Sequence, residues 1–249
     1  MGLKESGLRG SLRNVSVGID AIPDSGGSHQ WNHDEGEGTT LSDAIGGLDG
    51  AINGATWTSG AGTEDVYLDY DGTDDFTDLG SGSRSALSHF VNDGAGTILF
   101  WINPDTIASS GVNYIAGTAF TGSARSLIFA ARDGDDWFFR ATTSSDVVWD
   151  IQGGSADTNE WAAVAGVADG SDVFIYEAKP PDYDVTQVAS ATVGDTEGGD
   201  LEQNVNIGRE TDNETRHWDG GIDLAFTDTS AKSQSELQTF VDDSKKFYE

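Results

Sequence analysis

The sequence predicts an all-β protein in which two antiparallel sheets pack face to face as a sandwich, with one short helix near the C-terminus. About a dozen short apolar or aromatic runs alternate with clusters of Gly, Asp, Asn and Ser, a spacing typical of antiparallel sandwiches rather than of βαβ units. Two of these clusters, residues 133–136 and 168–171, each separate two runs as hairpin turns do. With 249 residues, 36% of them hydrophobic, the chain is long enough for one domain with its own core.

Twelve runs are predicted as strands because apolar side chains alternate along them or aromatic side chains gather in them. In chain order they are residues 66–70, 76–79, 97–102, 113–116, 126–131, 137–141, 147–151, 161–167, 173–178, 185–193, 204–207 and 222–226. The helix is predicted to begin at Ser233, since Ser233 and Glu236 have the spacing of a capping box. Leu237, Phe240 and Val241 then form the apolar stripe that would pack against the sandwich.

The chain is strongly acidic, with 43 Asp and Glu residues against 13 Lys and Arg residues and a net charge of −30. Such a charge repels nucleic acid phosphates and anionic lipid surfaces, so neither nucleic acid nor a membrane is expected as a partner. Because the acidic residues are mostly Asp and lysine is rare, we interpret the composition as halophilic: in molar salt the Debye length falls to about 3 Å and self-repulsion is screened. The alternative is an acidic, calcium-dependent extracellular protein.

Several kinds of site and segment are excluded by composition. The chain has no cysteine, so it has no disulfide, no thiol nucleophile and no zinc–thiolate site. No window approaches the roughly 18 to 20 apolar residues of a membrane span, so membrane insertion is not expected, and residues 1–8 lack the apolar core of a secretory signal.

We interpret residues 1–28 as an N-terminal anchoring and assembly arm and residues 29–249 as the folded domain. Residues 1–24 carry three basic and three acidic side chains, so the whole charge of −30 lies on residues 25–249. The arm mixes apolar and basic residues with Gly and Ser and shows no helical period. The alternative is a first β-strand that completes the domain's own sheet.

From Trp31 onward the chain carries a series of short motifs. In order, these are residues 31–43 (WNHDEGEGTTLSD), 46–50 (GGLDG), 52–57 (INGATW), 68–80 (LDYDGTDDFTDLG), 97–104 (TILFWINP), 206–209 (NIGR) and 219–223 (DGGID). Together they resemble the laminin-G-like jelly-roll domains of the concanavalin A-like lectin/glucanase superfamily, from residue 31 to about residue 249. The resemblance implies a jelly roll of two curved antiparallel sheets.

The same resemblance implies a structural Ca²⁺ site, in which Asp43 and Asp49 of an early turn and Asp223 of a late strand are the ligands. Ca²⁺ takes six to eight oxygen ligands. Three positions of the early turn carry Ala, Ile and Leu where the family commonly has Ser, Gly and Asn, which removes polar oxygens. The alternative is that these aspartates are solvated carboxylates of a halophilic surface, and residues 71–78 are interpreted as a turn between strands.

Large aromatic residues are expected mainly in the core between the sheets. Those placed there are Trp31, Trp57, Phe76, Trp101 and Trp161. A Trp can also stack against a sugar ring, and Trp218, beside His217 and Arg216 in a polar turn, is predicted to be exposed. These three residues are the candidate ligand-binding group.

Catalysis is not expected. Retaining glycosidases need two carboxylates about 5 to 5.5 Å apart, and relatives with this fold carry them as alternating Glu-x-Asp-x-Glu or Glu-x-Asp-x-x-Glu on one strand. The chain has no such run, its Ser and His residues have no triad context, and its four histidines lack metal-ligand spacing.

The N-terminal arm adds a second resemblance. Residues 10–16 and 21–25 are similar to the openings of structural proteins of haloarchaeal tailed viruses, in which a jelly roll follows a short attachment segment. This implies a non-catalytic protein at the virion surface, as a tail-fibre, spike or capsid turret or decoration subunit. Its arm would bind other virion proteins and its sandwich would bind host cell-surface glycans. Since the apolar residues of the arm need a partner surface, a homo-oligomer is expected, either a trimer or a pentamer.

The alternative function is a cellular carbohydrate-binding or adhesion module of a halophile surface protein. Its location would be extracellular or on the cell surface rather than on a virion. A signal segment or a neighbouring domain would favour this alternative.

Overall fold

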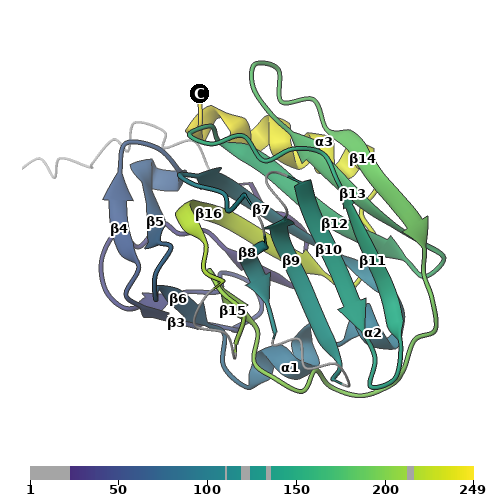
Figure 1. The fold of residues 1–249 in the computed structure, drawn as a ribbon. Coiled ribbons are helices and arrows are strands. Elements are labelled where there is room, and N and C mark those ends of the chain that lie inside the picture. Colours follow the sequence, from purple (N-terminus) through teal and green to yellow (C-terminus); the bar gives the residue numbers. More distant parts are fainter. Residues whose placement is uncertain (1–22, 110, 119–123, 133–135, 212–215) are drawn as a thin grey trace, which may run out of the picture.

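The computed structural model describes residues 23–109, 111–118, 124–132, 136–211 and 216–249, and in it two antiparallel sheets lie face to face (Figure 1). Sheet A contains, in spatial order, β14 (Thr186–Thr192), β13 (Asp172–Ala178), β12 (Ala162–Asp169), β7 (Ala95–Pro104), β16 (Asp219–Asp228), β5 (Val66–Asp71) and β4 (Thr56–Ser59), with β1 (His29–Trp31) also pairing with β16. Sheet B contains β11 (Val147–Gly153), β10 (Asp136–Thr142), β9 (Ser126–Arg132), β8 (Val112–Gly117), β15 (Asn206–Ile207), β6 (Phe76–Asp78), β3 (Gly50–Asn53) and β2 (Thr40–Leu41). The predicted two-sheet sandwich is therefore confirmed.

All twelve predicted strands are present, with ends that differ by a few residues. The predicted hairpin at residues 168–171 is the turn between β12 and β13, where Gly170 adopts a φ of +88° that favours glycine. The other predicted hairpin turn falls largely on residues 133–135, which lie outside the described residues.

The sequence missed the short elements. Four of them, β1 to β4, are strands of two to four residues, too short to show a period of their own. The helices α1 (Gly82–Ala86) and α2 (His89–Asn92) bury Phe90 and Val91 at one end of the sandwich. Two single 3₁₀ turns, η1 (Thr63–Asp65) and η2 (Lys245–Phe247), complete the described elements.

The predicted C-terminal helix is α3 (Gln234–Ser244), and its capping box is formed as expected: Ser233 accepts a hydrogen bond from the backbone of Glu236, whose side chain accepts one from the backbone of Ser233. The predicted stripe of Leu237, Phe240 and Val241 is buried. Among the described residues, no helix combines the length and the apolar composition needed to cross a membrane.

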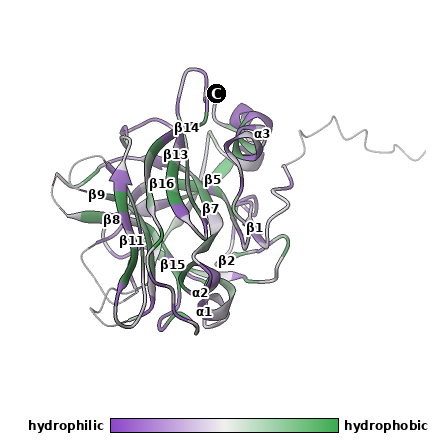
Figure 2. Ribbon diagram, turned by 90° about the vertical axis from the view of Figure 1, so that its right-hand side faces the viewer, coloured by the Kyte–Doolittle hydropathy of each residue, from purple (hydrophilic) through white to green (hydrophobic). Residues whose placement is uncertain are grey.

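The aromatic residues divide between two cores rather than filling one. Trp31 lies between the sheets as predicted, whereas Trp101 and Trp161 lie on the outer face of sheet A, in a second core that α3 covers. Phe76 was also predicted to lie between the sheets, but it is half-buried and the guanidinium of Arg209 stacks on its ring. In Figure 2 the hydrophobic colour accordingly follows the strands of both sheets and the inner side of α3.

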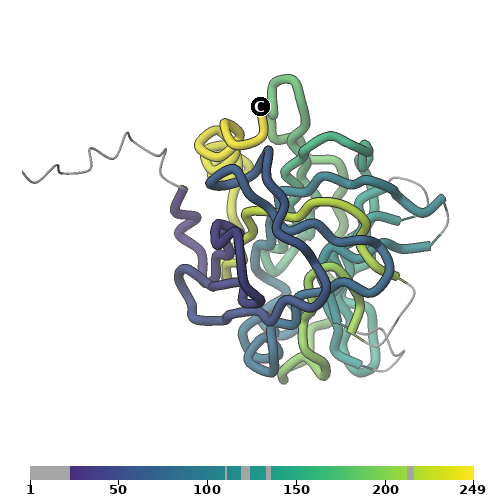
Figure 3. The backbone as a smooth tube through the Cα atoms, turned by 90° about the vertical axis from the view of Figure 1, so that its left-hand side faces the viewer, coloured from purple at the N-terminus to yellow at the C-terminus, as the bar shows by residue number. Residues whose placement is uncertain are grey.

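The N-terminal end of the described chain lies against α3. Residues 23–25 form a wall of a pocket whose other wall contains Leu237 and Phe240, and Figure 3 shows this first segment beside the C-terminal helix. The backbone N–H of Ser28 donates to the carbonyl oxygen of Thr227, and the chain then continues into β1 at His29. The rest of the predicted arm, residues 1–22, lies outside the described residues.

Candidate functional site

The first of the predicted calcium ligands, Asp43, is enclosed by donors. Its carboxylate accepts the backbone N–H groups of Gln30, Ile45, Gly46 and Leu48 at 2.8–3.0 Å. One of its oxygens also lies 2.6 Å from Nδ1 of His29. Burial acts to raise the pKa of Asp43, but these hydrogen bonds outweigh it and lower the pKa below its ordinary value. The carboxylate therefore organises the turn of residues 43–48 through its own hydrogen bonds.

Asp223 is completely buried in β16. The backbone N–H of Thr63 donates to its carboxyl group at 2.7 Å, and the hydroxyl of Tyr248 donates at 2.8 Å. Burial raises the pKa of Asp223 to about 7, although these hydrogen bonds act in the opposite direction. Gly62 completes the enclosure: its φ is +87°, and a Cβ there would lie 2.3 Å from the carbonyl oxygen of Val66.

The structure does not bring the three predicted ligands together. Asp49 is exposed and accepts the backbone N–H of Asp43, while Asp223 is enclosed by Thr63 and Tyr248. Within the described ranges, the one acidic group whose oxygens lie within 4.8 Å of one another consists of Asp71, Asp74 and Asp75. Asp43, Asp49 and Asp223 do not form such a group among the described residues. Calcium binding by the chain stays a prediction.

The predicted ligand-binding group is corrected in two of its three members. Trp218 is fully buried in the core between the sheets, and His217 is 3% exposed. The cause is backbone pairing: His217 forms a bridge with Arg209, and the N–H of Trp218 donates to Gly208, so this polar stretch behaves as a strand. A buried indole offers no face for a sugar ring. Arg216 is exposed, as expected of a ligand-binding residue.

Arg216 lies beside the outer face of sheet B, a surface that the sequence did not identify as a site. This face has an apolar floor made of Tyr114, Ile128, Ala130 and Phe138, all buried although they point away from the core between the sheets. Register explains their grouping: Ala130 of β9 stands between Tyr114 of β8 and Phe138 of β10. Alternate residues of the same strands, such as Phe129 and Phe139, point into the core instead.

Four arginines surround this floor, and we call the whole surface the arginine face. It consists of the floor residues Tyr114, Ile128, Ala130 and Phe138, the arginines Arg132, Arg140, Arg209 and Arg216, and the acidic residues Asp150 and Glu210. β9 contributes three of these side chains, β10 two, and β8 and β11 one each, while the rest follow β15, so no single linear motif marks the group.

Ion pairs join three strands, β9, β10 and β11, at one end of the arginine face. Arg140 lies 3.2 Å and Arg132 lies 3.9 Å from oxygens of Asp150, which faces Arg140 across β10 and β11. The guanidinium of Arg132 also lies 4.8 Å from the centre of the Phe138 ring. Asp150 thereby bridges two guanidinium groups beside an aromatic ring.

A second polar group lies at the other side of the floor. Nη1 of Arg216 is 3.5 Å from a carboxylate oxygen of Glu210 and 3.5 Å from the hydroxyl of Tyr114. Burial, followed by the negative charge of Glu210, raises the pKa of Tyr114, so its hydroxyl stays protonated and can donate or accept. Nearby, the guanidinium carbon of Arg209 lies 3.3 Å from the centre of the Phe76 ring.

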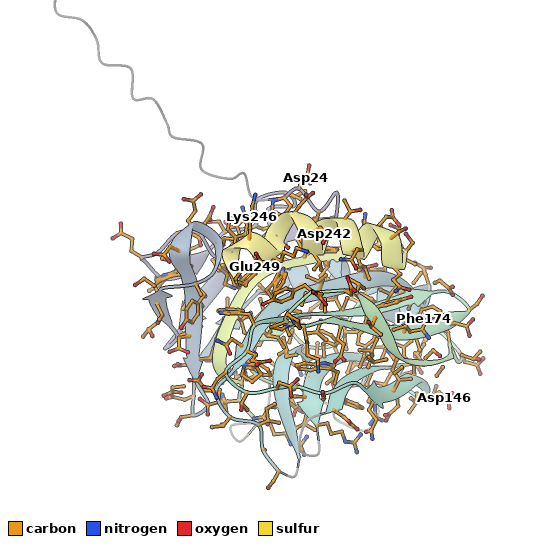
Figure 4. All side chains as sticks on the ribbon, turned by 90° about the horizontal axis from the view of Figure 1, so that it is seen from above. Asp24, Asp146, Phe174, Asp242, Lys246 and Glu249 are labelled. Carbon is orange, nitrogen blue, oxygen red and sulfur yellow. The ribbon has the colours of Figure 1, made fainter. Side chains whose placement is uncertain are left out.

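The two outer faces of the sandwich differ in accessibility. The outer face of sheet A is closed by α3 and by Tyr248, whose ring stacks on Trp101 with centroids 4.0 Å apart. Figure 4, seen from above, shows α3 with Asp242 on that side of the molecule. None of the described helices covers the outer face of sheet B (Figure 2). The floor residues themselves are only 0–3% exposed, so a ligand would meet the polar side chains around the floor, of which Arg132 and Arg216 are the more exposed.

Another hollow lies between residues 23–25 and α3. It has a volume of about 210 Å³ and is lined by Phe226, Leu237 and Phe240 with charged residues of both signs at its margin. It lacks the aromatic floor flanked by hydrogen-bonding groups that marks the arginine face, so we treat the arginine face as the candidate site.

Comparison with known proteins places the fold among carbohydrate-related domains. A family model described as the concanavalin A-like lectin/glucanases superfamily matches residues 71–238. A search of curated protein sequences found no match.

Solved structures with the same fold come from bacteria and a protozoan. Trypanosoma rangeli sialidase in complex with 2,3-difluorosialic acid is 14% identical, with a TM-score of 0.64 over 91% of this chain and 34% of the sialidase. Domain 4 of an extracellular GH43 arabinanase from Geobacillus stearothermophilus, in complex with arabinotriose, is 14% identical, with a TM-score of 0.58 over 86% and 97%. The CBM40 of Ruminococcus gnavus IT-sialidase, bound to α2,3 sialyllactose, is 13% identical, with a TM-score of 0.53 over 70% and 94%.

These comparisons differ in coverage. The chain spans about a third of the length of the Trypanosoma rangeli sialidase, but nearly the whole of the arabinanase domain and of the CBM40. At such identities the likeness concerns the fold.

Proposed function

The chain belongs to the concanavalin A-like lectin/glucanases superfamily, and from this premise we propose that it is a non-catalytic carbohydrate-binding protein. The observation that carries the proposal is the arginine face, a sheet surface that none of the described helices covers and that presents exposed guanidinium groups beside a carboxylate and a phenol. The hydroxyl groups of a sugar need donors and acceptors in fixed positions, and the guanidinium, carboxylate and phenol groups of this face supply both kinds. Two of the similar structures, the arabinanase domain and the CBM40, are complexes with saccharides, which supports the proposal.

A hydroxyl group of a saccharide would first meet Arg216, the exposed member of the group that it forms with Glu210 and Tyr114. A guanidinium donates, a carboxylate accepts and a phenol does both, so the three side chains match a pair of neighbouring hydroxyls. Glu210 and Tyr114 are buried and held by Arg216, which reduces the entropy lost when a ligand binds.

The absence of catalysis is part of the proposal. The two acidic residues of the arginine face, Asp150 and Glu210, each lie in an ion pair with an arginine. A retaining glycosidase instead needs two carboxyl groups that face the scissile bond about 5 to 5.5 Å apart, whereas each of these carboxylates is held by an arginine. Incubation with saccharides that bind should therefore release no reducing ends, and measurable release would contradict this part.

The binding proposal is tested with the full chain on a glycan array in molar KCl, followed by calorimetric titration of the saccharides that bind. Arg216→Ala should weaken binding by about tenfold or more, since a hydrogen bond to a charged donor contributes about 1.5 to 3 kcal/mol. Lys245→Ala removes one positive charge from the opposite side of the molecule, where Lys245 pairs with Asp242, and should leave the affinity unchanged. An array without any bound glycan would overturn the proposed function.

We further propose the setting expected from the sequence, the surface of a haloarchaeal tailed virus. Residues 1–28 would be its attachment to other virion proteins and to the sister subunits of a trimer or pentamer. The support is the division of charge, zero on residues 1–24 and −30 on the rest, together with the likeness of residues 10–16 and 21–25. A cellular adhesion module of a halophile is the alternative. Deleting residues 1–24 should leave a folded monomer by light scattering in molar salt, and a native-sized oligomer would contradict the arm.

A further inference from the structure

The two sides of the sandwich differ in how their edge strands are covered. On one side, β14 at the edge of sheet A lies against β11 at the edge of sheet B. The backbone N–H of Gly194 donates to the carbonyl oxygen of Val148 at 2.7 Å. A Cβ on Gly153 would lie 2.7 Å from the carbonyl oxygen of Val188. The two edges therefore cover each other along part of their length, which leaves little room there for a further strand.

The opposite edge of sheet A is β4, the outermost strand beside β5 (Figure 1). Within the described residues, β4 pairs with β5 alone, in a regular register from Thr56 to Ser59. An antiparallel strand directs alternate N–H and C=O groups to its two sides, so an edge strand presents unpaired groups to any strand that lies beside it. β4 is thus the edge at which sheet A can accept another strand.

The sequence around β4 lacks the features that commonly protect a free edge. Soluble proteins blunt such edges with charged residues, with proline or with a bulge. Residues 50–63 contain no charged residue and no proline, although 22% of the whole chain is charged. Trp57, in the middle of β4, is half-buried and packs against the core between the sheets. An added strand would therefore complete the burial of its ring.

Acidic residues lie at the ends of this uncharged edge. Glu64 and Asp65 are exposed in η1, between β4 and β5. Glu37 is exposed as well, and the carbonyl oxygen of its neighbour Gly38 accepts the indole N–H of Trp57 at 3.1 Å. A strand that joins β4 thus meets uncharged residues flanked by carboxylates, so basic side chains on that strand would be favoured.

The N-terminal arm of this chain has a sequence that matches such an edge. Residues 1–19 carry three basic side chains and one acidic side chain, in a chain whose net charge is −30. In residues 14–20 (NVSVGID) an apolar residue alternates with a polar residue or glycine, which is the period of a strand with one buried face. The arm lies outside the described residues, so this match is one of sequence.

We propose that residues 14–18 of one subunit pair as an added strand with β4 of the neighbouring subunit. Val15 and Val17 face Trp57, and the basic residues of the arm are attracted by the carboxylates at the ends of the edge. The contact joins two different surfaces, so it can close a ring of three or five subunits. This inference rests on the arm-mediated oligomer of the proposed function, and it names the surface that receives the arm.

Disulfide cross-linking tests the pairing directly. The sequence has no cysteine, so introduced cysteines can form disulfides only with each other. One full-length chain carries Thr58→Cys, and a second, tagged full-length chain is produced in the same cells and oxidised with it in molar KCl. The second chain carries one cysteine in the arm, in one of five versions: Asn14→Cys, Val15→Cys, Ser16→Cys, Val17→Cys or Gly18→Cys.

The expected pattern has a period of two. Side chains alternate along a strand, so Thr58 stands on the face of β4 opposite to Trp57. An even-numbered arm position should therefore cross-link to Thr58→Cys, and the odd-numbered positions should not. Thr186→Cys is the matched control, because Thr186 is an exposed threonine on β14 at the other edge of sheet A, and it should form no cross-link with the arm.

A second pair of variants needs no cysteine. Thr56→Lys places a positive charge on the free edge, where it repels the basic arm, and should weaken assembly of the full chain by about tenfold or more in light scattering. Thr186→Lys makes the same change on β14 and should leave the oligomer unchanged. Both variants lower the net negative charge, so a loss in Thr56→Lys alone is not general repulsion. Melting temperatures of both variants show whether a loss comes from unfolding.

The outcomes separate this inference from the proposed function. Equal cross-linking at odd and even positions overturns the strand pairing. Disulfides that form only when both cysteines are on one chain overturn the assignment to a neighbouring subunit. An oligomer that requires residues 1–24 but gives no cross-link to Thr58→Cys overturns this inference alone. A monomeric full chain overturns the proposed oligomer and the inference with it, and glycan binding on the arginine face is independent of both.

Discussion

Asp223 gives the sharpest test of the packing, because it is a fully buried acid in the middle of a sheet. Burial raises its pKa from an ordinary value of 3.8 to about 7. Between these two values the folded state binds a proton that the unfolded state has released, so the free energy of unfolding falls as pH rises from about 4 to about 7. The difference of about three pKa units corresponds to roughly 4 kcal/mol.

The perturbation is Asp223→Asn, which keeps the shape of the side chain and cannot ionise. The oxygen of its amide can still accept hydrogen bonds from the backbone N–H of Thr63 and from the hydroxyl of Tyr248. The variant therefore lacks the contribution of residue 223 to the pH dependence of the free energy of unfolding. Between pH 4 and pH 8 the free energy of unfolding of the wild type should fall by roughly 4 kcal/mol more than that of the variant.

The assay is urea unfolding at fixed molar KCl, followed by circular dichroism at several pH values for both proteins. Asp228→Asn serves as a control on the same strand with the opposite sign. Burial acts to raise the pKa of Asp228, but Lys232 and Ser230 lower it, so its stabilisation is present above the unfolded pKa and is lost as pH falls. If the difference between wild type and Asp223→Asn stays constant from pH 4 to pH 8, the carboxyl group is not protonated in the fold. A wild type that gains on the variant as pH rises would instead indicate an ionised Asp223 with a bound cation.

Four further outcomes follow from the charge, the calcium prediction and the packing. The melting temperature should be lower in 0.1 M than in 3 M KCl, because a net charge of −30 is poorly screened when the Debye length is about 10 Å; equal values would remove the halophilic interpretation. EDTA should lower the melting temperature if the calcium prediction is right, and an unchanged value in high salt would contradict it. Asp43→Asn should lower the free energy of unfolding, measured with urea, by about 1 to 3 kcal/mol with or without EDTA, because several backbone N–H groups lose a charged acceptor. An unchanged free energy would contradict the role of Asp43 in its turn. Tyr248→Ala should lower the free energy of unfolding by about 3 to 5 kcal/mol and shift the tryptophan emission to longer wavelength, since it uncovers Trp101. An unshifted spectrum would contradict the stacking of Tyr248 on Trp101.

The strands and the C-terminal helix were predictable from local pattern alone. Alternation and turn chemistry marked twelve of the sixteen described strands, and Ser233 with Glu236 marked the start of α3. The division of the aromatic residues was not predictable, because alternation tells that Trp101 is buried but not which side of sheet A it faces. Only the position of α3 decides that the outer face of sheet A is also a core.

The candidate site shows a similar limit. Trp218 was predicted to be exposed from its polar neighbours, yet pairing of this stretch with residues 208–209 turns its ring into the core. Arg216 was found because it adjoins that residue in sequence. Arg132 and Arg140 were missed, because an arginine in a strand carries no local mark of a site, and only the register of β9, β10 and β11 brings them to one carboxylate.

The central claim, that the protein binds glycan on the outer face of sheet B, is tested most directly by hydrogen exchange of the full chain with and without a saturating saccharide from the array. Bound saccharide should slow exchange in β8, β9 and β10 and in the segment around Arg216, while α3 should exchange at the same rate in both samples. Slowed exchange confined to α3 and residues 23–25, with β8 to β10 unchanged, would contradict the claim.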